Sequence, residues 1–247
     1  MMEELKAGVF ADALRLVKEK NPLVHCITNG VALNDCANIL LALGARPVMA
    51  EAPEESAEIT ARADALSVSL GMLSRDKKEA ILRSCHAAKE KGIPVLLDPV
   101  GIGGSRFRQQ AFREIMATGA VTVLKGNRSE IGFLTGENEP EKAAIRAAQM
   151  FSCTAAVTGE TDFASDGERI VRVTGGTPML ARITATGCMA SVLCAAFLAT
   201  MKEEPVTAAA CGIRAMDCAG EMAAGSCRDK GPGSFHATIF DAVAALR

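Results

Sequence analysis

Apolar and polar residues form alternating blocks along the chain, which predict strands and helices in turn. Short apolar runs of strand length recur at residues 23–27, 47–50, 65–69, 93–97, 121–124 and 153–157. The stretches between them carry apolar residues at helical spacing, at 3–20, 29–44, 54–63, 74–91, 107–117, from 127 and after 140. Strands that alternate with helices form βαβ units. The pattern therefore predicts an α/β fold with a mainly parallel central sheet and helices on both faces.

The last third of the chain departs from this alternation. Phe163–Ser165 and Ile170–Val173 flank the turn pair Asp166-Gly167, which predicts a small β-hairpin near 161–173. Two long helices are expected near 187–201 and 205–225, and a Gly-Pro-Gly break at 231–233 precedes a last one. No linker, low-complexity tract or internal repeat interrupts the sequence, so we expect residues 1–247 to form a single domain.

Composition and charge exclude several classes of function. The 247 residues carry a formal net charge of −2 and contain no Trp or Tyr, so they offer neither a basic field nor stacking side chains for nucleic acid. The most apolar stretch, Met189–Met201, is too short to cross a membrane. Nine cysteines without a Cys-x-x-Cys pair, and an N-terminus without a signal peptide, are typical of buried thiols in a reducing cytoplasm.

The commonest phosphate-binding motifs are absent. The chain has no P-loop, and Gly101–Gly104 fails as a dinucleotide fingerprint because Arg106 occupies the third glycine position. A carboxylate, Asp98, nevertheless follows the apolar run at 93–97. The carboxyl ends of parallel strands carry functional groups in such sheets, although an isolated Asp there serves equally well as a helix cap.

A second polar cluster opens the helix expected from residue 127. Asn127 and Glu130 are three residues apart and share a face of the first turn. An amide and a carboxylate could hold Mg²⁺ through its water ligands, because this ion keeps much of its hydration in proteins. The same pair also fits a capping box with Asn127 as N-cap, and taken alone that interpretation is favoured.

A third motif, Thr184-Ala185-Thr186-Gly187-Cys188, precedes an apolar helix. Small residues let backbone N–H groups approach an anion, and the N-terminus of a helix attracts negative charge. The motif therefore suits a phosphoryl group, although Thr186 would also make an ordinary N-cap.

In combination, these motifs are far more specific than any one of them. The chain resembles the hydroxyethylthiazole kinases, a family of the ribokinase-like superfamily, over nearly its whole length. The segments that carry the resemblance are Pro22–Asn29, Leu40–Ala45, Pro47–Ala50, Leu97–Gly101, Gly126–Ile131, Val157–Glu160, Thr186–Met189 and Gly231–Phe235. Cys188 is the most specific residue among them, since most ribokinase-like enzymes have Asp at that position.

The resemblance implies a kinase that transfers a phosphoryl group from Mg-ATP to the hydroxyl of hydroxyethylthiazole in thiamine salvage. It implies that Gly187 and Cys188 lie at the phosphoryl-transfer centre, and that Asp98 and Glu130 serve Mg²⁺. The residues implied in ATP binding are Lys125, Asn127 and Thr158, and those implied at the thiazole are Asn29, Val31, Met49, Gly71 and Ala185. It also implies a homotrimer with the thiazole site between subunits.

Two positions depart from the family pattern. Lys125 stands where the family usually has Arg, so the charge is kept but the bidentate fork is lost. Ala185 replaces the first Gly of Gly-Thr-Gly-Cys, and its methyl group is expected to disfavour a positive φ and to reshape the pocket. At the first turn of its helix, the Cys188 thiol is expected to have a lowered pKa, so that it accepts or orients the proton of the substrate hydroxyl.

Other interpretations use the same residues. A kinase of pyridoxal or hydroxymethylpyrimidine, or a dehydratase that repairs hydrated nicotinamide cofactors, belongs to the same superfamily but generally keeps Asp where Cys188 stands. A thiazole-binding protein that has lost catalysis is consistent with Lys125 and Ala185, and predicts binding without ATP turnover. A purely structural oligomer leaves the polar residues at the sheet edge unexplained.

Overall fold

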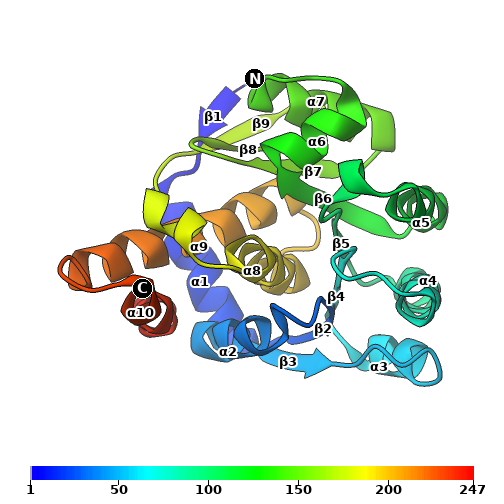
Figure 1. Cartoon of the computed structure of the whole chain (residues 1–247), viewed down its shortest axis with the longest axis horizontal. Helices are drawn as coiled ribbons and strands as arrows, with labels where there is room; N and C mark the ends of the chain where they lie inside the picture. The colour runs from blue at the N-terminus through cyan, green and yellow to red at the C-terminus, as the bar shows by residue number, and fades with distance from the viewer. Residues whose placement is uncertain (1) are drawn as a thin grey trace.

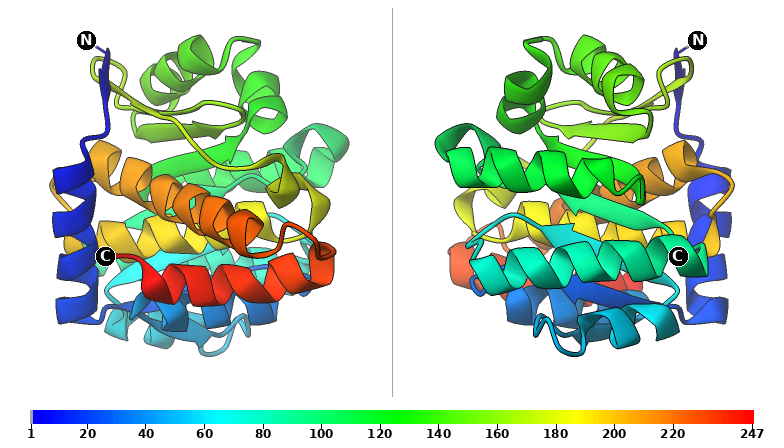
Figure 2. Two further views of the ribbon diagram at one scale, coloured as in Figure 1. Left: turned by 90° about the vertical axis from the view of Figure 1, so that its left-hand side faces the viewer. Right: turned by 90° about the vertical axis from the view of Figure 1, so that its right-hand side faces the viewer.

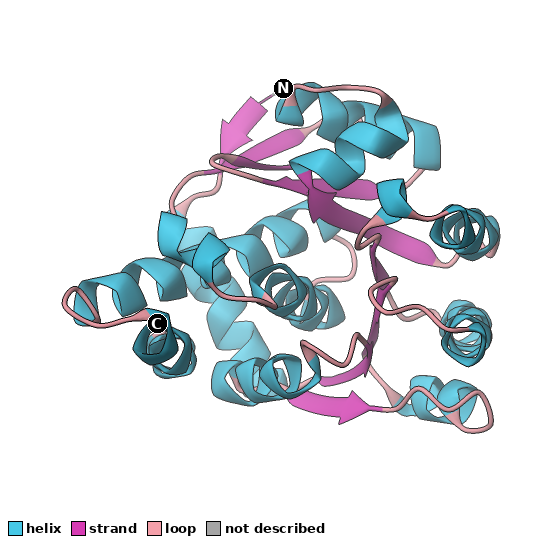
Figure 3. Ribbon diagram, in the orientation of Figure 1, coloured by secondary structure: helices cyan, strands magenta, loops and turns pink. Residues whose placement is uncertain are grey.

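The computed structural model describes residues 2–247, which form a nine-stranded sheet in the order β1-β9-β8-β7-β6-β5-β4-β2-β3 (Figure 1 and Figure 3). The strands are β1 (Met2–Glu4), β2 (Leu23–Ile27), β3 (Arg46–Met49), β4 (Ala65–Ser69), β5 (Val95–Asp98), β6 (Val121–Asn127), β7 (Thr154–Thr158), β8 (Asp162–Ser165) and β9 (Ile170–Val173). The helices are α1 (Ala7–Lys20), α2 (Leu33–Leu43), α3 (Ser56–Arg62), α4 (Arg75–Lys91), α5 (Arg106–Ala117), α6 (Arg128–Thr135), α7 (Pro140–Phe151), α8 (Thr186–Thr200), α9 (Pro205–Ser226) and α10 (Pro232–Ala245), with short 3-10 turns η1 (Ile102–Gly104) and η2 (Pro178–Arg182).

The predicted fold class is confirmed. Strands β2 to β7 pair in parallel, whereas β8 runs opposite to both of its neighbours, β7 and β9. The antiparallel β8–β9 pair is the hairpin expected near 161–173, with Gly167 of the Asp-Gly turn at φ 100°. Strands β4 and β5 are buried throughout, as expected for parallel strands that helices cover on both faces.

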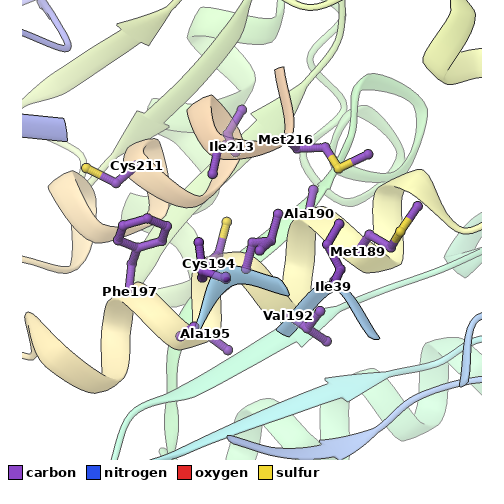
Figure 4. Close-up of a cluster of buried hydrophobic side chains, with 14 of the residues drawn as sticks. Ile39, Met189, Ala190, Val192, Cys194, Ala195, Phe197, Cys211, Ile213 and Met216 are labelled. Carbon is purple, nitrogen blue, oxygen red and sulfur yellow. The ribbon is translucent and has the colours of Figure 1, made fainter. Parts of the chain in front are cut away.

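Two hydrophobic clusters lie on opposite faces of the sheet. One joins α1, α2, α8, α9 and α10 to the sheet, and the other joins α3 to α7. Helix α8 is buried along almost its whole length, and Figure 4 shows its side chains packed with those of α2 and α9. Figure 2 shows α9 and α10 forming the outer layer on this face. Gly212 of α9 permits this packing, because a Cβ there would lie 2.3 Å from the Cα of Cys194 on α8.

Element ends follow their local residues, with two corrections to the sequence analysis. Gly44 and Gly92 end α2 and α4 in the left-handed conformation, where glycine has no Cβ penalty. The helix expected over 3–20 begins only at Ala7, because Met2–Glu4 pairs with β9 as an edge strand. Asn29 does not cap α2 directly: the N-cap is Ala32, and Asn29 Oδ1 instead accepts hydrogen bonds from the backbone of Val31 and Ala32.

Within residues 2–247, no helix is long and apolar enough to cross a membrane. The nine cysteines are all free, and seven of them are buried, as the sequence predicts.

Candidate active site

Functional side chains gather where the parallel strands end. Asp98 ends β5, Asn127 ends β6 and Thr158 ends β7. The sheet register places Asp98 beside Ser69, and Asn127 beside Thr158. The N-terminus of α8 reaches the same edge, because its residue Gly187 accepts a hydrogen bond from Lys125 of β6. The sheet therefore brings one end of α8 to the edge where ligands bind in open parallel sheets.

Asp98 is buried at the centre of this edge. It is 3% exposed, and the Ser191 hydroxyl of α8 donates a hydrogen bond of 2.7 Å to its Oδ2. Ser191 Oγ also lies 3.0 Å from the carbonyl oxygen of Gly187, so it links the carboxylate to the first turn of α8. Burial raises the pKa of Asp98 to about 6; the charge of Lys125 opposes this rise, and that of Glu130 adds to it. Asp98 is a strand residue here, and the alternative of a helix cap is wrong.

Lys125 is as deeply buried as Asp98. It is 2% exposed, and its Nζ donates a hydrogen bond of 2.9 Å to the carbonyl oxygen of Gly187. Burial by itself lowers the pKa of Lys125, but the neighbouring charges, that of Asp98 above all, outweigh it and raise the pKa. The ammonium group is therefore held charged under the start of α8, where it can face negative charge on a ligand.

Glu130 and Asn127 form the capping box that the sequence allows. Asn127 Oδ1 accepts from the backbone N–H of Glu130 at 3.0 Å, and Glu130 Oε2 accepts from that of Asn127 at 2.9 Å. Glu130 Oε1 accepts in addition from Gly101 N–H at 3.1 Å, which ties the loop after β5 to α6. The cap thus fixes the Glu130 carboxylate near Asp98, as the mutual effect of their charges indicates.

The carboxylates of Asp98 and Glu130 suit Mg²⁺ better than a metal ion whose ligands must all come from the protein. Within residues 2–247, no group of three or more His, Cys, Asp or Glu side chains could hold a metal ion. The charge of Glu130 raises the pKa of Asp98, so the pair carries negative charge that a cation would neutralise. Mg²⁺ is bound in many proteins by one or two carboxylates, with waters and phosphates as its other ligands. The residues present therefore fit this ion when phosphates accompany it.

Cys188 is oriented by Asn29. Because Asn29 Oδ1 accepts from the backbone of Val31 and Ala32, its Nδ2 is directed at Cys188 Sγ and donates a hydrogen bond of 3.2 Å. The expected lowering of the Cys188 pKa is wrong. Burial raises the pKa to about 11 and the charge of Asp98 adds to the rise, although Lys125 and the Asn29 hydrogen bond oppose it. Desolvation therefore outweighs the helix N-terminus, and the group is a thiol at neutral pH.

Ala185 holds a conformation that the sequence analysis did not expect. It is the N-cap of α8, with φ 69° and ψ −7°, in the left-handed region. The alternative in which Thr186 is the N-cap is also wrong, since Thr186 is the first helical residue and its hydroxyl donates to the carbonyl oxygen of Leu180. Ala185 therefore carries backbone strain at the start of α8.

We expect Ala185→Gly to stabilise the protein by about 0.5–1 kcal/mol. Glycine removes a left-handed penalty of about 1–2 kcal/mol, and the larger entropy of the unfolded chain offsets part of this. The melting temperature should rise by about 1–4 °C, measured by thermal unfolding. Ala195→Gly, in the helical middle of α8, is the matched control and should lower it. An unchanged or lower melting temperature for Ala185→Gly would show that the site stores no strain.

In the single chain, the side of the site that the family resemblance assigns to the thiazole is open. Gly71 packs against Asn29, because a Cβ on Gly71 would lie 2.9 Å from Asn29 Nδ2. Val31 and Met72, on the two adjoining loops, are 60% and 62% exposed. Met49 ends β3 and, like Ala185, packs on the cluster that contains α8. Asn29 therefore contacts both Gly71 and Cys188, whereas Val31 faces outward.

Lys77, which the sequence did not single out, ties these two loops together. It is 5% exposed, and its Nζ donates to the carbonyl oxygens of Thr28 and, at 2.9 Å, Gly71. Burial lowers its pKa, although the charge of Glu51 opposes this. Lys77 lies in the first turn of α4, where a positive charge is unfavourable to the helix dipole. Its position is therefore explained by the loop contacts rather than by the helix.

Lys77→Met is expected to lower the free energy of unfolding by about 2–4 kcal/mol, since two carbonyl groups lose their donor. The KM for the thiazole should rise more than the KM for ATP, because the loops carrying Asn29 and Gly71 become free to separate. Lys78→Met is the control: Lys78 pairs with Glu114 at a partly exposed position, and such a pair contributes about 1 kcal/mol or less. Equal effects of the two variants on the thiazole KM would contradict this role.

Four candidate residues line one cavity. Lys125, Asn127, Thr158 and Gly187 surround a cavity of 390 Å³, and residues of β8, η2, α8 and α9 contribute to its other walls. A second cavity of 990 Å³ shares Gly159, Leu180, Ala181 and Asp217 with the first, and extends to Arg128 and Pro140. Together they form a path that begins at the first turn of α8 and leads outward, with room for a nucleotide.

Sequence reasoning missed several residues of this site. Ser191 is a lone polar residue in an apolar helix, four residues after Gly187, and that spacing was the available signal. Lys77 and Asp217 carry no such signal, because each reaches the site from a helix that belongs to another part of the chain.

The fold and site define the class of protein first. A ribokinase-like superfamily protein from Enterococcus faecalis V583 has the same fold, with a TM-score of 0.71 at 14% identity over 100% of this chain and 97% of that one. Together with the carboxylate at the end of β5 and the small-residue turn of α8, this defines a ribokinase-like fold.

The particular family follows from closer relatives. Residues 14–247 match the hydroxyethylthiazole kinase family, and the chain belongs to it. The hydroxyethylthiazole kinase of Methanosphaerula palustris is 42% identical over 96% of this chain and 93% of its own length. The structure of a hydroxyethylthiazole kinase protein from Pyrococcus horikoshii OT3 matches with a TM-score of 0.92 at 40% identity, over 97% of this chain and 94% of that one.

Proposed function

We propose that this chain phosphorylates the hydroxyl group of hydroxyethylthiazole with ATP, as a single ribokinase-like domain over residues 1–247, and so serves thiamine salvage. The family places the chain among kinases of this substrate. The observation that carries the proposal is the arrangement at the start of α8. There Cys188, oriented by Asn29 at 3.2 Å, lies on the same turn as Gly187, which Lys125 contacts at 2.9 Å.

Phosphoryl transfer requires mainly positioning and stabilisation of charge, because its transition state is loose. The backbone N–H groups of the first turn of α8, from Thr186 to Cys188, are free to bind the oxygens of the transferred group. Lys125 holds its positive charge below that turn. Asn29 and Gly71 hold the thiazole so that its hydroxyl meets Cys188, and Met49, Val31 and Ala185 complete that pocket.

Cys188 receives or orients the proton of the substrate hydroxyl. Since the pKa of Cys188 is about 11, only a small fraction of it is thiolate at neutral pH. A strong base is not required, because a loose transition state allows the proton to leave late in the reaction. Asp98 and Glu130 would hold Mg²⁺, which supplies neutralisation of the phosphate charges when bound. Asn127 and Thr158 line the cavity on the side where the remaining phosphates and the nucleoside extend.

We also propose a homotrimer whose neighbouring subunit covers the thiazole. Val31, Leu33 and Met72 are large apolar residues that are 60%, 43% and 62% exposed around the open side of the site, and a second subunit would bury them. The place of action we propose is the cytoplasm, where reducing conditions keep nine unpaired thiols free.

The test is release of ADP from Mg-ATP with hydroxyethylthiazole, compared with hydroxymethylpyrimidine, pyridoxal and no acceptor. Turnover that depends on the thiazole supports the proposal. Faster turnover with pyridoxal or hydroxymethylpyrimidine would favour the related kinases instead. Thiazole binding without turnover, measured by calorimetry on the folded protein, would favour a binding protein that has lost catalysis.

A further inference from the structure

Two carboxyl groups face each other in the wall of the nucleotide-sized path, away from the phosphoryl centre. Asp162 of β8 is 4% exposed and Asp217 of α9 is 7% exposed, and their side chains are hydrogen-bonded to each other. Two carboxylates can share a hydrogen bond only if one of them carries a proton. The Gly159 N–H that donates to Asp162 Oδ1 at 2.8 Å favours the charged form of Asp162, which makes Asp162 the better acceptor. The proton therefore belongs to Asp217.

Asp217 has no other partner in the described part of the chain. Within residues 2–247, its Oδ2 is fully buried and accepts no hydrogen bond, whereas its Oδ1 faces Gly176, on which an added Cβ would lie 2.9 Å from that oxygen. The nearby Arg214 donates no hydrogen bond to Asp217. Its guanidinium donates to the carbonyl oxygen of Thr174 at 3.0 Å and lies 3.7 Å from Glu221. A ligand cannot reach an oxygen without accessible surface, so the buried Oδ2 suits the contact with Asp162. Oδ1, beside Gly176 of the larger cavity, is then the acceptor that a ligand can meet.

The position of Asp217 indicates which part of a ligand it meets. It lines both cavities, and the smaller one has Lys125 and Gly187 at its inner end. Phosphates directed at those residues would leave the nucleoside beside Asp217. The walls there are the apolar side chains of Leu180, Ile213 and Met216, which suit a flat base better than a charged group.

We propose that Asp217, held neutral by Asp162, accepts a hydrogen bond from the nucleoside of the bound nucleotide and is a specificity-determining residue. The inference rests on the proposed function, because it takes ATP as the phosphoryl donor. The ligand must offer an N–H or O–H group, and the apolar walls favour the exocyclic amino group of adenine. A ribose hydroxyl offers the same chemistry and is distinguished below.

Protonation couples this recognition to pH. Burial raises the pKa of Asp217 to about 8, the charges of Asp162 and Glu221 add to the rise, and Arg214 opposes it. Burial also raises the pKa of Asp162, against the charge of Lys125. Above about pH 8 the shared proton is lost, and a second negative charge then faces the nucleotide. Nucleotide binding should weaken in that range.

The experiment measures dissociation constants by calorimetry for ADP, purine riboside diphosphate, 2′-deoxy-ADP and 3′-deoxy-ADP. Purine riboside diphosphate lacks only the exocyclic amino group. The wild-type protein should bind it about three- to tenfold more weakly than ADP, and Asp217→Ala should bind the two equally. Asp217→Asn should keep the preference, because its amide N–H can donate to Asp162 while its oxygen accepts. The dissociation constant of Asp217→Asn for ADP should be equal at pH 7 and pH 9, whereas that of the wild type should be higher at pH 9.

Each outcome decides the proposal. Asp217→Ala could instead lose the preference of the wild type for ADP over one of the deoxy analogues. The donor would then be a ribose hydroxyl, and the Asp217 carboxyl would still recognise the nucleoside. If Asp217→Ala, folded as judged by its melting temperature, keeps every preference of the wild type, the inference is wrong. Absence of ADP binding and ATP turnover in the wild type would instead refute the proposed function itself.

Discussion

Asp98→Asn is expected to lower kcat by about 10²–10³-fold, the usual effect of removing one group that stabilises transition-state charge. Asp98 is the buried carboxylate at the end of β5, and Asn keeps its shape and its contact with Ser191. What the variant loses is the charge that we propose draws Mg²⁺ and the phosphates to the start of α8. Steady-state kinetics with varied Mg²⁺ would measure the change, and a kcat within a factor of a few of wild type would contradict the assignment.

The same substitution should stabilise the fold. Burial raises the pKa of Asp98 from 3.8 to about 6, so between these values the folded protein binds the proton more tightly than the unfolded chain does. Stability therefore falls as the pH rises through this window, and at pH 8 the buried charge costs about 3 kcal/mol. This figure already includes the attraction to Lys125, which lowers the pKa of Asp98.

Thermal unfolding without Mg²⁺ tests whether Asp98→Asn raises or lowers the stability. The Asn variant should melt above the wild type, by more at pH 8 than at pH 5. Ser191→Ala is the matched control, since it removes the hydrogen bond to Asp98 but keeps the charge. It should lower kcat by about tenfold or less, the equivalent of one hydrogen bond. A melting temperature that falls in Asp98→Asn would mean that its pairing with Lys125 outweighs desolvation.

Most of the fold can be predicted from sequence because its elements are marked locally. The buried parallel strand β5 lies in a short apolar run, and Gly44 and Gly92 end helices α2 and α4. Strand β1 could not be found in this way. Its residues are exposed and polar, and they form a strand only because the edge of β9 is available to pair with them.

The candidate site likewise contains residues that the sequence predicts and features that it does not. Asp98 was predicted because functional groups of such sheets lie at strand ends, which the sequence marks, and Asn127 because it opens a helix directly after a strand. Thr158 was predicted only through the family resemblance. The positive φ of Ala185 was not, since it results from how η2 enters α8 rather than from the residue itself. The pairing of Asp162 with Asp217 joins β8 to α9 across about fifty residues, and no local pattern encodes it. Burial and long-range contact are therefore what the sequence could not supply.

The Cys188 pKa is the sharpest example, and it leads to the second large effect. A helix N-terminus lowers the pKa of a thiol, but burial of Cys188, together with the charge of Asp98, raises it to about 11. If the thiolate accepts the proton, kcat of the wild type should rise with pH between 7 and 9, because the thiolate fraction grows about tenfold per unit below the pKa.

Cys188→Ala is expected to lower kcat by about 10²-fold or more, the lower range for general base catalysis, and to abolish that rise with pH. The dissociation constant for ATP should be unchanged, because the thiol faces Asn29 on the thiazole side. Cys188→Ser should likewise lower kcat strongly, since the hydroxyl keeps the hydrogen bond but ionises far less readily. Cys194→Ala, a buried thiol on the same helix, is the control and should leave kcat and its pH dependence as in the wild type. If Cys188→Ser turned over at the wild-type rate with a wild-type pH profile, Cys188 would only orient the substrate hydroxyl, and the proton would leave by another acceptor such as the phosphate itself.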